Sequence, residues 1–335
     1  MTATRVSAVV VTWNSVRDIA SCLDSLQSQS IKPFEIIVVD NDSSDGTPDF
    51  VALHYPDVEL IRLNTNAGFA KGNNIGIKAS TGDWLLLLNP DAEVDPKWTE
   101  RLLEFAEGNR QIGMLGGVLW RSGDDHGDHS TIDSLGIEIY KSRRVRDIGA
   151  GEKSKHIPDS PWQVFGVCAA AVILKREMLV DITIESQIFP ERFFCYYEDA
   201  DLAWRAFRRG WQAWLVPSAN GFHRRGGSPV GNRFSRYYTH RNRLWMILRN
   251  DSFANLMRAF PEIFLHELFM LARVIRYPYL LRAVWQSLAG IGASLRERKS
   301  LPDRGSDSLP FKLGIGFSRA EKTAAILPTE KNIHK

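Results

Sequence analysis

Short apolar runs alternate with amphipathic segments through residues 1–120. The clearest run, at residues 84–88, ends at Asn-Pro, which is typical of a buried central strand. Three further runs predict strands at residues 6–12, 34–39 and 60–63. Because these strands alternate with helical patterns at short intervals, the region is expected to form a mostly parallel, Rossmann-like α/β sheet.

Helix signals follow the first three predicted strands. Asn14 and Ser15 are expected to cap a helix whose apolar residues recur at helical spacing over residues 16–26. Thr47-Pro48 supplies a cap and a first-turn proline for a second helix. A third helix is expected to follow an Asn/Gly-rich loop at residues 64–68 and to extend to about residue 79.

The polar segment at residues 121–130 carries several potential metal ligands. These are Asp124, Asp125, His126, Asp128 and His129. A metal site needs ligands that are held in place, and nothing in the sequence of this segment supplies rigidity. A solvated loop is therefore favoured over a metal site.

The pattern is less regular after this loop. Residues 132–140 and 144–148 predict a β-hairpin, and the small-residue-rich segment 164–174 predicts a buried strand. An amphipathic helix is expected over residues 198–210, where Gly210 ends it, and a further strand over residues 211–216.

Beyond Tyr237 the pattern becomes helical and rich in Arg, Leu and aromatic residues, whereas residues 301–335 show little periodicity and are expected to form a tail. Residues 241–299 contain ten Lys/Arg against four Asp/Glu. Basic helices with wide apolar faces can lie in a membrane interface without spanning it. The same faces could instead pack on the rest of the chain or on a second subunit, so a membrane contact and a homo-oligomer both stay open.

The composition is that of an ordinary globular protein, with 44% apolar and 24% charged residues among 335 and a net charge of +3. So small a net charge gives no reason to expect a nucleic-acid partner. Cys22, Cys168 and Cys195 are odd in number and lack metal-ligand spacing, which favours buried thiols in a reducing compartment. The chain shows neither an apolar leader nor a run of about 18 apolar residues, so a cytoplasmic location is expected.

Three polar side chains follow the ends of predicted strands. Asp40, Asn66 and Asp91 each come directly after an apolar run or in the loop behind it. Because the carboxyl ends of parallel strands meet at one edge of the sheet, these residues are expected to converge there. Asp91 is then placed to hold a hard cation against a phosphate, although it could also simply cap its proline turn.

Five segments with unusual polar content occur in a fixed order. They are residues 10–14 (VVTWN), 39–47 (VDNDSSDGT), 64–74 (NTNAGFAKGNN), 89–91 (NPD) and 196–202 (YYEDADL). The order and spacing of these segments resemble those of the motifs of the family 2 glycosyltransferases with the A-type fold. More narrowly, they resemble the rhamnosyltransferase-like bacterial branch of that family. The resemblance extends over residues 5–245. It implies an enzyme that moves a sugar from a nucleoside diphosphate to an acceptor hydroxyl.

The resemblance also implies a nucleotide-sugar pocket. In it, Asp40 would accept hydrogen bonds from the base or ribose, and Gly68 would let the backbone approach the nucleotide closely. The residues expected to contact the donor are Thr12, Asn14, Asp40, Asn66, Gly68, Asn73, Asn89, Arg225 and Arg241. Arg225 would help to neutralise the leaving diphosphate.

Asn89-Pro90-Asp91 stands where the family has Asp-x-Asp. The resemblance implies that Asp91 binds a divalent cation, Mg²⁺ or Mn²⁺, and that His223 joins it, since related transferases place a metal-binding His after the corresponding strand. Asn89 is a departure that brings no negative charge, so the ion should be held more weakly. Alternatively, Asn89 only forms a turn before proline, and His223 is a surface residue without a function.

The chemistry also needs a base for the acceptor hydroxyl. Glu198 and Asp199 stand at a predicted helix start, where carboxylates are favoured, and the resemblance implies that Asp199 is the base and that Glu198 orients the acceptor. Asp201 would cap or support the helix. The alternative is that all three carboxylates only complement the helix dipole.

The expected function is therefore inverting transfer of a sugar from a nucleotide donor. The resemblance suggests dTDP-rhamnose as donor and a lipid-linked or cell-envelope glycan as acceptor, with galactofuranose as another possible sugar. A protein that binds nucleotide sugars without catalysis is the second hypothesis. A dehydrogenase is disfavoured because no G-x-G-x-x-G follows the first strand.

The expected domain organisation follows from these assignments. Residues 1–235 would form the catalytic domain, with a nucleotide-binding half at residues 1–120 and an acceptor-binding half at residues 121–235. Residues 236–300 would form a helical extension and residues 301–335 a tail. If the extension binds lipid, the protein would lie at the inner face of the cell membrane.

Overall fold

The computed structural model describes residues 4–121, 130–153, 157–225 and 231–300. The potential metal ligands of the polar loop, Asp124 to His129, lie outside the described residues. The predicted tail at residues 301–335 lies outside them as well.

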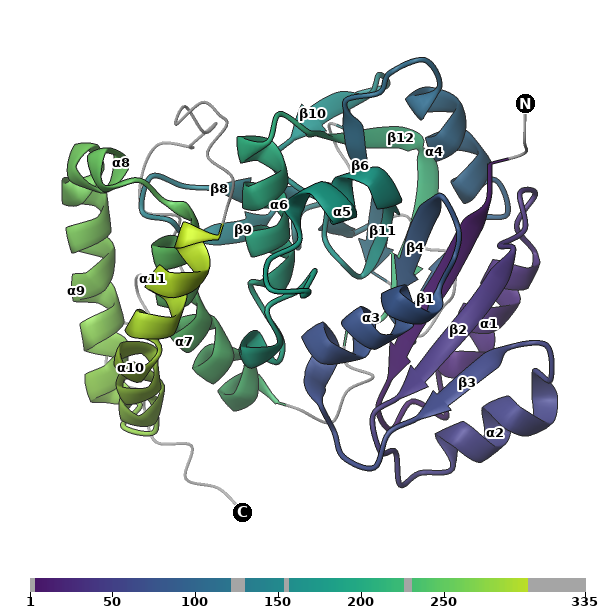
Figure 1. Ribbon diagram of the computed structural model, residues 1–335, viewed down its shortest axis with the longest axis horizontal. Coiled ribbons are helices and arrows are strands. Elements are labelled where there is room, and N and C mark those ends of the chain that lie inside the picture. The colour runs from purple at the N-terminus through teal and green to yellow at the C-terminus, as the bar shows by residue number, and fades with distance from the viewer. Residues whose placement is uncertain (1–3, 122–129, 154–156, 226–230, 301–335) are drawn as a thin grey trace.

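One large mixed sheet forms the centre of the molecule (Figure 1). Its strands are β1 (Val6–Thr12), β2 (Glu35–Asp40), β3 (Glu59–Arg62), β4 (Trp84–Leu88), β5 (Ala92–Val94), β6 (Ile112–Arg121), β7 (Ile132–Ser134), β10 (Trp162–Val164), β11 (Ala171–Lys175) and β12 (Gln212–His223). Among the described residues the main strand order is β10-β12-β6-β11-β4-β1-β2-β3, with β5 on β12 and β7 on β6. The neighbours β1 to β4 are parallel, which confirms the predicted α/β sheet.

The chain changes direction at β1. From β1 it proceeds to β2 and β3 on one side and then returns to place β4 on the other side. Open α/β sheets bind ligands in the crevice at the carboxyl ends of the strands where such a reversal occurs. The segments after β1 and β4 flank this crevice.

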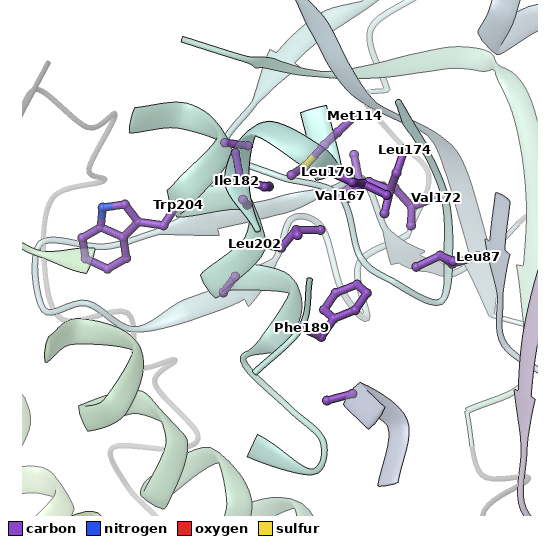
Figure 2. Close-up of a cluster of buried hydrophobic side chains, with 14 of the residues drawn as sticks. Leu87, Met114, Val167, Val172, Leu174, Leu179, Ile182, Phe189, Leu202 and Trp204 are labelled. Atoms are coloured by element: carbon purple, nitrogen blue, oxygen red, sulfur yellow. The ribbon is translucent and has the colours of Figure 1, made fainter. Parts of the chain in front are cut away.

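Helices cover both faces of the sheet (Figure 1). They are α1 (Ile19–Gln27), α2 (Thr47–His54), α3 (Gly68–Ala79), α4 (Trp98–Ala106), α5 (Arg176–Ile182) and α6 (Glu198–Arg208). Because successive strand residues point to opposite faces, Leu85 and Leu87 pack in one core with α3, α5 and α6, while Leu86 and Leu88 pack in the other with α1, α2 and α4. Figure 2 shows part of the first core, including Leu87. Full burial of such a side chain contributes roughly 1.5–3 kcal/mol.

The C-terminal part is helical, as predicted. Its helices are α7 (Asn232–Asn250), α8 (Phe253–Arg258), α9 (Phe260–Arg276), α10 (Leu280–Ala289) and α11 (Ile291–Lys299). Helix α7 packs on α6 as well as on α10 and α11, and therefore joins the extension to the sheet domain. Because α7 begins at Asn232, the expected boundary at residue 235 falls inside this helix.

Two local predictions are wrong. Helix α1 begins at Ile19 rather than behind a cap at Asn14-Ser15, because the Ser15 carbonyl first closes a turn with the amides of Asp18 and Ile19. The predicted strand 164–174 is two strands, β10 and β11. The segment between them leaves the sheet, and its small side chains at residues 168–170 line a cavity.

Other local predictions are confirmed. The hairpin forms from β8 (Ile137–Ile139) and β9 (Val145–Asp147), whereas residues 132–134 of its predicted first strand form β7 and pair with β6. Helix α2 has the predicted first-turn proline, although its N-cap is Gly46 and Thr47, the predicted cap, is its first residue. Gly210 follows α6 with the positive φ of +83° that ends a helix. Strand β12 extends past the expected end at residue 216 and places His223 at its last position.

Candidate active site

A cavity of about 720 Å³ opens at the carboxyl ends of β1 and β4. One side is formed by the loops behind these strands, and the other by the segment that leads into α6 and by the first turns of α7. The predicted site residues that line it are Thr12, Asn66, Gly68, Asn89, Asp91, Glu198, Asp199, His223 and Arg225. The expected convergence of Asn66 and Asp91 is therefore found.

Four predicted donor contacts do not line the cavity. Asn14 accepts a hydrogen bond from the Ser44 amide at 2.8 Å, and Asn73 is buried and donates to the Phe69 carbonyl at 2.9 Å. Arg241 is buried, and its guanidinium donates to backbone carbonyls. Asp40 is also buried, but its Oδ1 has no hydrogen-bond partner in the described structure. These side chains support the loops behind the cavity wall.

Gly68 is placed where only glycine fits. Its φ is +86°, and a Cβ at this position would lie 2.5 Å from the ring of Phe194. The close approach is therefore between the start of α3 and the segment that precedes α6. The Ala70 amide strengthens this contact by donating to the Phe194 carbonyl at 3.0 Å.

A chain of polar contacts crosses the cavity floor at His223. Its Nε2 lies 3.3 Å from Oδ1 of Asp91, and its Nδ1 lies 2.9 Å from Oδ2 of Asp133. Asn89 Nδ2 is 3.5 Å from the same Nε2. Burial alone would lower the pKa of His223, but the carboxylates of Asp133 and Asp91 raise it to about 9.

Asp133, on β7, is a residue that the sequence did not single out. It is fully buried, and its second oxygen also pairs with Arg225 at 2.5 Å, while Arg225 reaches Asp147 as well. The charge of Arg225 is thus already shared between two carboxylates. An isolated Asp in an apolar stretch was the only signal in the sequence, and it does not reveal a partner 90 residues away.

The residues at this floor fit a divalent cation. With a pKa of about 9, His223 is protonated near neutral pH, so a cation would have to displace the Nε2 proton. Nε2 would then face Asp91 with a lone pair while Nδ1 still donates to Asp133, an arrangement typical of metal-binding histidines. Asn89 Oδ1 is buried nearby without a hydrogen-bond partner in the described structure. The described residues contain no cluster of three His, Cys, Asp or Glu side chains with metal-site geometry, so phosphate or water oxygens would have to complete the coordination.

The carboxylates of Glu198 and Asp199 begin α6 on the other side of the cavity. Burial, with a smaller contribution from Asp147, raises the pKa of Asp199 to about 6. Burial and the neighbouring Asp199 raise the pKa of Glu198 well above its ordinary value. Near neutral pH Asp199 is therefore ionised and able to accept a proton, whereas burial and the charge of Asp199 favour the protonated form of Glu198.

Asp201 belongs to the support of α6 and not to the cavity. It is fully buried and accepts hydrogen bonds from Arg205, Arg249 and Asn250 at 2.7 to 2.9 Å. These partners hold its pKa below the ordinary value although burial opposes them. The supporting role expected for Asp201 agrees with these contacts.

The backbone before α6 is held in an unusual conformation. Phe194, Tyr196 and Tyr197 all have positive φ, between +66° and +70°. Residues other than glycine rarely adopt this region of backbone conformation. Asn242 on α7 donates to the carbonyls of Phe193, Cys195 and Tyr196 at 2.8 to 2.9 Å. No local sequence pattern indicates this contact of Asn242.

The adjacent Arg241 completes the support. Its guanidinium donates to the carbonyls of Arg192 and Phe193 at 2.9 and 2.8 Å and to Asn242 Oδ1 at 2.8 Å. Arg241 and Asn242 together bind the backbone that positions Glu198 and Asp199. This placement differs from the nucleotide contact expected for Arg241.

A mostly parallel α/β sheet with a polar cavity at its switch point is typical of nucleotide-binding proteins. The profile of the family described as "Glycosyl transferase family 2" matches residues 7–182, more than half of the chain. The chain therefore belongs to glycosyltransferase family 2. It is an enzyme that transfers a sugar from a nucleotide donor.

Two curated relatives illustrate its neighbours in sequence. An N-acetylglucosaminyl-diphospho-decaprenol L-rhamnosyltransferase of Mycobacterium tuberculosis is 25% identical over 269 residues, which cover 72% of this chain and 82% of the relative. The succinoglycan biosynthesis protein ExoO of Rhizobium meliloti is 37% identical over 103 residues, 30% of each chain.

Two solved structures share the fold. The mannosyltransferase PcManGT from Pyrobaculum calidifontis, in complex with GDP-Man and Mn²⁺, matches with a TM-score of 0.53 and 19% identity, over 87% of this chain and 76% of that one. GalNAc-T7 with UDP, GalNAc and Mn²⁺ matches with a TM-score of 0.54 and 16% identity, over 74% of this chain and 48% of that one. At these identities the likeness shows the A-type fold alone.

Proposed function

We propose that the enzyme transfers its sugar with inversion and uses Asp199 as the general base. The observation that carries this proposal is a buried carboxylate with a raised pKa of about 6 that lines the same cavity as Asp91 and His223. A base is most effective when its pKa lies near the working pH. A carboxylate that served only the helix dipole would not need to be buried in a cavity.

In the proposed step, Asp199 removes the proton from the acceptor hydroxyl as that oxygen attacks the anomeric carbon. The bond from this carbon to the diphosphate oxygen breaks, and the sugar is transferred with inverted configuration. Glu198, whose protonated form is favoured by burial and by the charge of Asp199, orients the acceptor. The buried Thr12 Oγ1 and Asn89 Oδ1, which belong to cavity-lining residues and have no hydrogen-bond partner in the described structure, supply sites for donor groups.

Asp91 and His223, with Asn89 beside them, would hold a divalent cation. When bound, such an ion supplies positive charge for the leaving diphosphate. Arg225 can add less to this task than expected, because Asp133 and Asp147 already share its charge. With one carboxylate in the ligand set, the affinity for the ion should be modest, and Mg²⁺ or Mn²⁺ should bind more tightly when the donor is present.

For the donor we favour dTDP-rhamnose and for the acceptor a lipid-linked glycan. The name of the mycobacterial relative supports rhamnose as the sugar and a lipid-linked acceptor, since it describes rhamnosyl transfer to N-acetylglucosaminyl-diphospho-decaprenol. The dTDP carrier is what the sequence resemblance suggests. Galactofuranose stays as the alternative sugar. We also propose that the protein works in the cytoplasm in the biosynthesis of a cell-envelope polysaccharide.

The test is a panel of nucleoside diphosphates and their sugars, read first by thermal shift and then by release of nucleoside diphosphate. Donor binding should raise the melting temperature, because a ligand that binds the native state stabilises it. We expect the largest shift with dTDP-rhamnose in the presence of Mn²⁺ or Mg²⁺. A larger shift with another sugar nucleotide would overturn the assignment of dTDP-rhamnose as donor. A product in which the sugar keeps its anomeric configuration would overturn the inverting mechanism.

A further inference from the structure

An uncovered apolar stripe runs along α9. Phe260, Phe264, Leu268, Leu271 and Ile275 are 48% to 74% exposed and recur at three- and four-residue spacing, so they lie on one face of the helix. The opposite face of the same helix is buried. Helices α8 and α9 form the end of the molecule furthest from β3 (Figure 1).

The exposed apolar surface is not confined to α9. On α10, Leu281, Trp285 and Leu288 are 59%, 74% and 52% exposed at helical spacing, and on α8 Phe253 and Met257 are 74% and 56% exposed. Scattered exposed apolar residues are normal, but so many on consecutive helices mark an interaction surface. We name these exposed side chains of α8, α9 and α10 the apolar face.

The charges around the apolar face are basic. From α8 to α11 the chain carries seven Lys/Arg and three Asp/Glu. Each acidic side chain is paired with a cation outside these helices: Glu262 with Lys141, Glu267 with Arg243, and Glu297 with Arg192. Exposed cations on these helices are Arg258, Arg282, Arg296 and Lys299. The outward charge is therefore positive, and its complement is an anionic surface.

Aromatic and arginine side chains gather at the corner between α9 and α10. Arg236 lies over the ring of Tyr277 at 4.9 Å, and Arg233 lies over the ring of Tyr279 at 4.5 Å. Tyrosine, tryptophan and arginine are the side chains that favour the boundary between lipid headgroups and acyl chains. Both arginines belong to the first turns of α7, whose other residues, Asn232, Phe234 and Ser235, line the active-site cavity.

We propose that the apolar face docks on an anionic lipid bilayer and brings the cavity to the acceptor at the membrane surface. None of the described helices is long and apolar enough to cross a membrane. The apolar face would lie in the interface, with the arginines at the lipid phosphates. A second copy of the chain fits less well, because it would set one basic surface against another. The inference rests on the proposed lipid-linked acceptor but concerns binding rather than catalysis.

The experiment is vesicle flotation of the full chain. Vesicles of pure phosphatidylcholine are compared with vesicles in which roughly a third of the lipid is phosphatidylglycerol, at low and high salt, since salt weakens the electrostatic contribution. Leu271→Glu places a charge in the apolar face, and Ile275→Glu is a second such variant. The matched control is Leu53→Glu on α2, because Leu53 is 76% exposed but lies outside the face.

We expect the wild type and Leu53→Glu to float with anionic vesicles, and the bound fraction to fall at least tenfold in Leu271→Glu and Ile275→Glu. Arg282→Glu should lose the preference for anionic lipid. No flotation of the wild type, or equal loss in the Leu53→Glu control, would overturn the proposal. A wild-type dimer that Leu271→Glu dissociates, without vesicle binding, would assign the face to a second copy instead. Donor hydrolysis, measured without vesicles, tests the proposed function separately.

Discussion

The two walls of the active-site cavity are built in different ways. On the donor side, the residues lie in short loops directly behind β1 and β4, and the sheet fixes where those loops begin. On the base side, Asp199 follows a segment with three positive φ values that is held by α7, 46 to 49 residues further along the chain. The position of the donor site is thus a property of the sheet, whereas that of the base depends on long-range hydrogen bonds.

The difference has an energetic side. Non-glycine residues in sparsely populated backbone regions cost about 1–3 kcal/mol each and persist only when their surroundings hold them. The three carbonyl contacts of Asn242 and those of Arg241 supply that support. The two walls also touch where Phe194 meets Gly68 and the Ala70 amide. We therefore expect substitutions on the base side to lower turnover without weakening donor binding, and substitutions on the donor side to weaken both.

The largest separation should come from Asp199→Asn. Transfer should fall by about 10²–10⁴-fold, because a positioned base is lost, while the dissociation constant for the donor stays near the wild-type value. Calorimetric donor titration beside a transfer assay measures both. Wild-type turnover in this variant would remove Asp199 from the mechanism.

On the opposite wall, Asp91→Ala should weaken binding and catalysis together. Loss of the cation's charge beside the diphosphate costs several kcal/mol, so transfer should fall by at least about 10²-fold. His223→Ala should follow the same pattern less severely. Direct titration with Mn²⁺ in the presence of nucleoside diphosphate gives a readout that is independent of turnover. Indifference of both binding and activity to chelator and to Asp91→Ala would show that no metal acts here.

The dependence of the base on α7 predicts a smaller effect for Asn242→Ala. The turnover number should fall by about 10-fold, less than the roughly 10²-fold of an ångström-scale displacement, because Arg241 still holds part of the segment. The Michaelis constant for the donor should hardly change. Asn250→Ala is the matched control, since this buried α7 amide binds Asp201 and the Met246 carbonyl and does not touch residues 193–196. An equal loss of turnover in the control would refute a specific role of Asn242.

A still smaller effect concerns stability. The folded-state pKa of Asp199 is raised from 3.8 to about 6, so ionisation of this carboxylate destabilises the folded protein. The penalty is absent below about pH 3.8, accumulates up to about pH 6 and is complete above that. Asp199→Asn should therefore raise the melting temperature at pH 8, and the gain should shrink as the pH falls toward 4. A lower melting temperature at pH 8 would contradict the burial of an uncompensated charge.

The donor side of the cavity could be predicted from the sequence better than the base side. Strand ends, and hence Asp91, Asn89 and Thr12, could be located because apolar periodicity marks where a strand stops. Asp133 and Asn242 could not, since their roles depend on partners 90 and 46 to 49 residues away that no local pattern encodes. The segment 164–174 was misassigned for a related reason. Its apolar content is typical of a strand. The residues between β10 and β11, however, pack beside the cavity and against α6 rather than within the sheet.

The pH dependence of kcat/KM, measured for the wild type and for Asn242→Ala, tests the account most directly. In the wild type the acidic limb should have a midpoint near pH 6, because Asp199 must lose its proton to act and burial raises its pKa to about 6. In Asn242→Ala the midpoint should move to lower pH as water reaches a less firmly held carboxylate, and Asn250→Ala should leave it in place. A limb that is absent near pH 6, or that stays unchanged in Asn242→Ala, would contradict a base positioned by α7.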